Sequence, residues 1–60
     1  MNRSKWKVTL KNRAGQPESF LYFGTENTKL DAAKVGRVAE RLLKSSSKGY
    51  QQIIKIEQVT

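Results

Sequence analysis

Apolar and polar side chains alternate most regularly over residues 5–11, Lys5-Trp6-Lys7-Val8-Thr9-Leu10-Lys11. A period of two with aromatic and β-branched residues is typical of a strand that is buried on one face only. We therefore expect Trp6, Val8 and Leu10 to lie in the core, with the lysines on the opposite face of the strand.

A turn and a second strand are predicted next. Residues 12–18 contain Asn, Gly and Pro, which favour a chain reversal. Residues 19–24 then predict a strand with apolar side chains on both faces, which makes a hairpin with the first strand. The register of this hairpin stays open, so the outer face carries one of two pairs: Phe20 with Tyr22, or Leu21 with Phe23.

A helix is predicted from Lys29 to about Ser45, preceded by the capping-box pattern Thr28-Lys29-Leu30-Asp31. Asp31 also projects toward the apolar stripe, which is unusual for a core position, and we expect its carboxylate to accept hydrogen bonds from free amides of the first turn. Gly36 lies at the edge of the apolar stripe, where a close approach to the sheet and chance explain it equally well. The stripe itself recurs at three- and four-residue spacing and comprises Ala32, Val35, Val38, Ala39, Leu42 and Leu43.

The chain closes with a third predicted strand. Residues 45–50 end the helix, with Gly49 as a candidate left-handed residue, and residues 51–59 form the strand. A right-handed crossover places it beside the first strand. The predicted fold is α+β: a β-β-α-β unit with a three-stranded antiparallel sheet, order 2-1-3, and one helix packed on one face. Residues 1–60 form a single domain, because sixty residues are too few for two cores.

Composition excludes several classes of protein. The chain has no Cys and no His, which excludes disulfides and the usual zinc sites. The five acids are spread along the chain with no pair at a spacing that suggests shared acid-base work, so we expect a protein that is not an enzyme and that binds no metal or cofactor. No apolar run exceeds four residues, which predicts a cytoplasmic protein that has no membrane partner.

The net charge of +7, from twelve Lys or Arg and five Asp or Glu, falls on two predicted surfaces. The sheet surface combines basic residues with aromatic residues that could stack on bases: Lys5, Lys7, Lys11, Arg13, Phe20 and Tyr22. The helix surface follows i, i+3, i+7 and i+10 spacing opposite the apolar stripe: Lys34, Arg37, Arg41 and Lys44. A solvated helix face is the alternative reading of this second set, although Glu40 is the one acid beside it.

These surfaces predict a small nucleic-acid-binding accessory protein that contacts phosphates with little sequence specificity. DNA and RNA, and single strands and duplexes, stay open as ligands. The alternative is an adaptor or inhibitor that docks on an acidic protein or adds to the edge of a partner's sheet. Because so short a chain buries little surface, a second copy forming a homodimer would also add stability.

Four short runs of residues suggest a family resemblance: Lys5-Trp6-Lys7-Val8, Ala14-Gly15, Phe23-Gly24-Thr25 and Ala39-Glu40-Arg41-Leu42. In outline the sequence resembles the small arm-site DNA-binding domains of tyrosine integrases, which pair a three-stranded sheet with one helix. Those domains place all three strands before the helix, whereas the third predicted strand here follows it.

Overall fold

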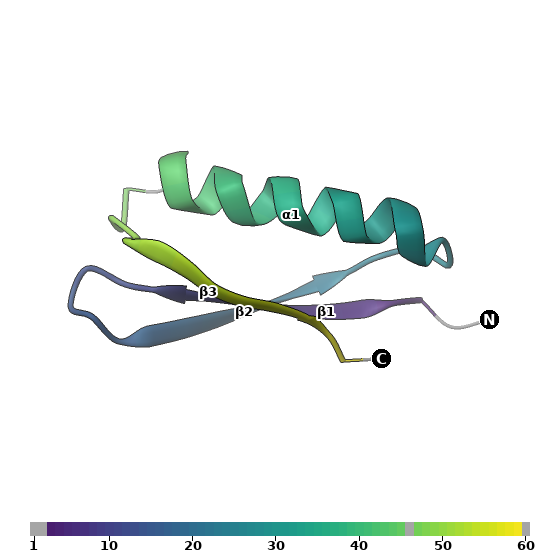
Figure 1. Ribbon diagram of the computed structural model, residues 1–60, viewed down its shortest axis with the longest axis horizontal. Helices are drawn as coiled ribbons and strands as arrows, with labels where there is room; N and C mark the ends of the chain where they lie inside the picture. The colour runs from purple at the N-terminus through teal and green to yellow at the C-terminus, as the bar shows by residue number, and fades with distance from the viewer. Residues whose placement is uncertain (1–2, 46, 60) are drawn as a thin grey trace.

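The computed structural model describes residues 3–45 and 47–59 as one sheet covered by one helix. The predicted helix end includes Ser46, which lies outside the described residues. The elements are β1 (Lys5–Lys11), β2 (Pro17–Phe23), α1 (Thr28–Ser45) and β3 (Gln52–Gln58). Figure 1 shows the two layers, with α1 lying along one face of the sheet. The strand order is β2-β1-β3 with both pairs antiparallel, which confirms the predicted α+β fold.

A tight turn connects β1 to β2 and sets their register. The amide of Gly15 donates to the carbonyl of Asn12, and the amide of Asn12 donates to the carbonyl of Gln16. Gly15 has a φ of +84°, a left-handed conformation that glycine adopts without strain. The turn is shorter than predicted, because Pro17 already pairs with Lys11 as the first residue of an edge strand.

The third strand pairs with the other edge of β1. Val8 lies opposite Ile56 and Thr9 opposite Lys55, but Leu10 lies opposite Ile53. This shift of one residue between Thr9 and Leu10 is a bulge that skips Ile54. It keeps Ile53 and Ile56 in line with the inward-facing residues of β1. Gly49, in the connection before the strand, has a φ of +71°, as predicted from its position after the helix.

The core lies between β1 and α1. Its buried apolar side chains are Trp6, Val8, Leu10, Val35, Ala39 and Tyr50. Leu42, Leu43 and Ile53 pack against this cluster from its margin. Alternation along β1 therefore places its three apolar residues inside, as predicted. Its lysines, Lys5, Lys7 and Lys11, lie on the opposite face of the sheet, which we call the open face.

The first turn of α1 differs from prediction. Asn27 caps the helix, because its side-chain oxygen accepts a hydrogen bond from the Leu30 amide at 3.1 Å. Asp31 faces inward, toward the apolar stripe as its position predicts, but its carboxylate binds Ser4 and Thr25 instead of amides of the first turn. Ala32, predicted as part of the apolar stripe, is exposed. Gly36 marks no close approach to the sheet, since a Cβ added there would meet nothing within 4 Å.

Candidate functional site

The open face is built on the outward side of β1, where Lys5, Lys7, Thr9 and Lys11 alternate with the buried residues. All four are partly exposed. Successive residues on one face of a strand lie about 6.8 Å apart. The three lysines therefore form a row of positive charges along the central strand of the sheet.

The hairpin register decides which aromatic residues join this row. Trp6 lies opposite Tyr22 and Val8 opposite Phe20, so Phe20 and Tyr22 share the helix side of the sheet. Both pack against the core, and the Phe20 ring meets the Tyr50 ring edge-on at 5.8 Å. The expected place of Phe20 and Tyr22 on the open face is therefore wrong.

Leu21 and Phe23 occupy the open face instead. Lys7 pairs with Leu21 and Lys5 pairs with Phe23. The two apolar side chains are 57% and 61% exposed. The Lys5 ammonium lies 5.6 Å from the centre of the Phe23 ring, within cation–π range. The structure thus brings a cation and an accessible ring together at one end of the face.

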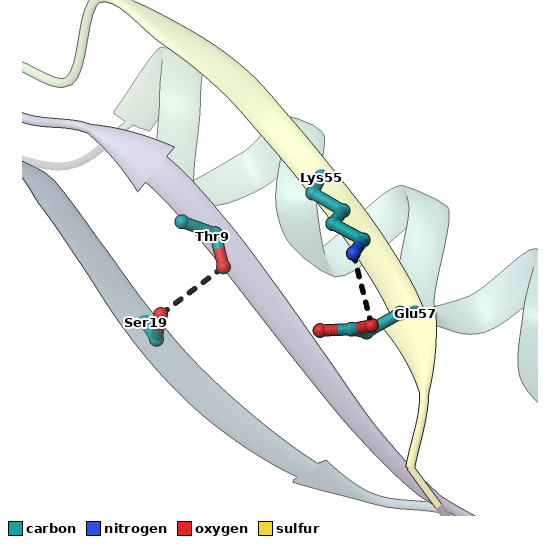
Figure 2. Close-up of polar contacts among 4 residues, drawn as sticks. All are labelled: Thr9, Ser19, Lys55 and Glu57. Atoms are coloured by element: carbon teal, nitrogen blue, oxygen red, sulfur yellow. Dashed lines mark hydrogen bonds and ion pairs between the residues drawn. The ribbon is translucent and has the colours of Figure 1, made fainter.

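Polar contacts cross the middle of the open face. Figure 2 views the sheet with α1 behind it, so the four labelled side chains lie on the open face. The hydroxyls of Thr9 and Ser19 hydrogen-bond at 3.1 Å, between β1 and β2. On β3, Lys55 forms an ion pair with Glu57 at 3.2 Å. Four lysines and one glutamate on the three strands leave this face with three positive charges.

Arg13 lies apart from the strand lysines, in the turn at the end of the hairpin. Its guanidinium covers Gly49, where an added Cβ would lie 2.9 Å from Nε and Nη2. The Arg13 carbonyl also accepts a hydrogen bond from the Gln51 side chain at 3.0 Å. Arg13 therefore lies at the end of the molecule where the hairpin meets the α1–β3 connection. Arg13 and Lys48 both line a shallow depression there.

The helix surface is arranged as predicted. Its four basic residues, Lys34, Arg37, Arg41 and Lys44, are all exposed. The buried Val35 and Ala39 face the sheet, so these four lie on the outer side of α1. At 1.5 Å per residue the row spans about 15 Å. The helix surface and the open face therefore point in opposite directions, with the core between them.

A buried polar network holds the start of β1 against the start of α1. Asp31 accepts hydrogen bonds from the Ser4 hydroxyl at 2.6 Å and from the amide and hydroxyl of Thr25 at 2.7 and 2.9 Å. The Trp6 indole donates to Ser4 Oγ at 2.9 Å. The Ser4 bond contributes most to lowering the pKa of Asp31; burial opposes it, and Thr25 and the charge of Lys34 assist it. Sequence reasoning missed the parts of Ser4 and Thr25, because their pairing with Asp31 depends on tertiary contact.

A second polar group lies at the other end of the core. The Tyr50 hydroxyl donates to Glu18 at 3.3 Å, and Asn12 donates to the other oxygen of the same carboxylate at 2.8 Å. Burial, followed by the charge of Glu18 and this bond, raises the pKa of Tyr50. Asn12 lies in the hairpin turn and Tyr50 lies in the core, so both hydrogen bonds to Glu18 stabilise the fold.

Two kinds of feature are absent from residues 3–45 and 47–59. These residues contain no group of three or more acidic, Cys or His side chains placed to hold a metal ion. No helix within the same ranges is both long and apolar enough to cross a bilayer.

Comparison with known proteins gives no relative of this chain. No family model, curated protein or solved structure matches it.

Proposed function

We propose that this protein is a small nucleic-acid-binding accessory protein that contacts mainly phosphates and reads little sequence. The observation that carries the proposal is the uneven charge on two exposed surfaces. The open face has four lysines and Glu57, and the helix surface has four basic residues beside Glu40. A face whose only task is solubility usually interleaves both signs, whereas these two faces leave most of their positive charge uncompensated.

Phosphate binding suits these side chains physically. Lysine and arginine neutralise phosphates and release condensed counterions, which supplies most of the free energy of non-specific binding. The helix surface offers Arg37 and Arg41 one turn apart, and guanidinium groups can bind phosphate oxygens with two parallel hydrogen bonds.

Titration tests the proposal directly. The full chain is titrated against single-stranded and duplex oligonucleotides at about 50 and 200 mM salt. Binding at the lower concentration that weakens steeply at the higher supports the proposal, and no binding to either oligonucleotide contradicts it. The double variant Arg37→Glu/Arg41→Glu should bind more weakly while it keeps the far-ultraviolet circular dichroism spectrum of the wild type, because both side chains are exposed.

A protein-binding adaptor or inhibitor is the second candidate, favoured by the edge strand β2. This strand contains no lysine, the residue that most often protects an exposed sheet edge from pairing. An extended segment of an acidic partner could pair with its free backbone groups while Lys5 and Lys7 bind the acidic side chains. Recovery of one stoichiometric partner after nuclease treatment would support this second function over the first.

A further inference from the structure

We infer that the open face binds single-stranded nucleic acid, with Phe23 as the platform on which a base stacks. This inference rests on the proposed function and assigns a ligand class to one of its two surfaces. Lys5, Lys7, Lys11 and Lys55 contact the phosphates, and Leu21 provides apolar surface beside the ring. The helix surface contacts phosphates alone.

Phe23 is suited to stacking by its exposure and its position. It is the last residue of β2, it lies on an edge strand, and 61% of its surface is exposed. Its register partner Lys5 approaches the ring from the central strand, so a base on Phe23 would have its own phosphate within reach of an ammonium group. Stacking on an aromatic side chain tolerates any base, because every base has a π face.

A single strand can make more contacts with the open face than a duplex can. In a duplex the bases already stack on one another, and its outer surface offers phosphates to the lysines but no base face to Phe23. A single strand can turn its bases toward the ring and keep its phosphates against the lysine row. The exposed apolar surface of Leu21 and Phe23 would then be covered only by the single strand.

Charge distinguishes this ligand from a second copy of the chain. Two open faces in contact would oppose Lys5, Lys7 and Lys11 with the same residues, and the one acid on each face is already paired with Lys55. An anionic ligand removes this repulsion. A poly-glutamate peptide would also satisfy the lysines, but it has no aromatic ring to stack on Phe23, so it should compete poorly.

The test compares a thymidine oligonucleotide of about twelve residues, within the usual size range of single-strand sites, with the same strand annealed to its complement. Phe23→Ala should weaken single-strand binding about tenfold or more and leave duplex binding within about twofold. Phe23→Trp should restore single-strand binding. Leu30→Ala is the matched control, because it removes a 48% exposed apolar side chain from α1, away from the open face.

The outcomes separate this inference from the function on which it rests. Equal binding of both oligonucleotides, unchanged in Phe23→Ala, would overturn the single-strand site and leave phosphate binding intact. Absence of binding to either would overturn both. Competition by a poly-glutamate peptide as strong as that by the single strand, at equal charge, would overturn the stacking role. Glu57→Gln should raise single-strand affinity, since it removes the acid from the open face.

Discussion

The Ser4 hydroxyl donates a 2.6 Å hydrogen bond to the Asp31 carboxylate, which is fully buried and 27 residues away in the chain. Because Trp6 also donates to Ser4 Oγ, this contact joins the start of β1 to the first turn of α1. Lys5, whose ammonium lies 5.6 Å from the centre of the Phe23 ring, stands between Ser4 and Trp6 in the chain. The network therefore supports the open face although it lies on the other side of the sheet.

Acid should weaken the fold through Asp31. Its native pKa lies below its ordinary value of 3.8, so the stabilisation is complete above that pH and is lost as pH falls from 3.8 through the native pKa. Urea unfolding, followed by the fluorescence of the single, buried Trp6, measures the effect at neutral pH and in steps below 3.8. Asp31→Asn cannot ionise at this site, so it should be less stable at neutral pH and lose less on acidification. Equal losses in the two proteins would contradict this role of Asp31.

Gly24 should not tolerate a side chain. An added Cβ would collide with Ser4 Oγ and lie 2.6 Å from the Asp31 carboxyl carbon. Overpacking of this kind typically costs about 1–3 kcal/mol, and we expect Gly24→Ala to lower the free energy of unfolding by that amount. Urea denaturation checks it, and unchanged stability would show that the Ser4–Asp31 contact is not tightly packed around Gly24.

The same substitution at Gly36 should have the opposite effect on stability. Gly36 lies inside α1 with no neighbour within 4 Å of an added Cβ, and alanine favours a helix over glycine by about 1 kcal/mol. Gly36→Ala should therefore raise the free energy of unfolding by about 0.5–1 kcal/mol. A loss of stability in the same denaturation experiment would mean that this position is more closely packed than the structure shows.

The sequence predicts the elements and the strand order better than it predicts the register of the β1–β2 hairpin. Alternation places β1 at residues 5–11, as observed, and the helical stripe and the crossover account for α1 and the strand order. The hairpin register depends on the turn. A three-residue turn that ends at Gly15 would have placed Phe20 and Tyr22 on the helix side, whereas the predicted longer turn left both pairs open.

Asp31 and Gly36 show a second limit. Local patterns assigned Asp31 to helix capping, but Asn27 caps the helix, and the inward position of Asp31 depends on donors from β1 and the β2–α1 connection. Neither donor can be identified from helix periodicity. Gly36 lies at the edge of the apolar stripe, and no contact at that position requires glycine.

The basic faces should make separable contributions to binding. Each phosphate contact on a single strand contributes about 0.7 to the slope of log K against log salt. Lys5→Ala/Lys7→Ala on the open face and Arg37→Ala/Arg41→Ala on the helix surface each remove two basic groups. If both faces contact the same ligand, each double variant should reduce the slope by about 1.4. A change in one variant only would assign binding to that face.

The salt dependence of wild-type binding to a single-stranded oligonucleotide tests phosphate recognition most directly. Titrations between about 50 and 200 mM salt should give a linear plot of log K against log salt, with a negative slope that reflects several released counterions. Binding whose affinity does not change with salt, or no binding at about 50 mM, would contradict the account.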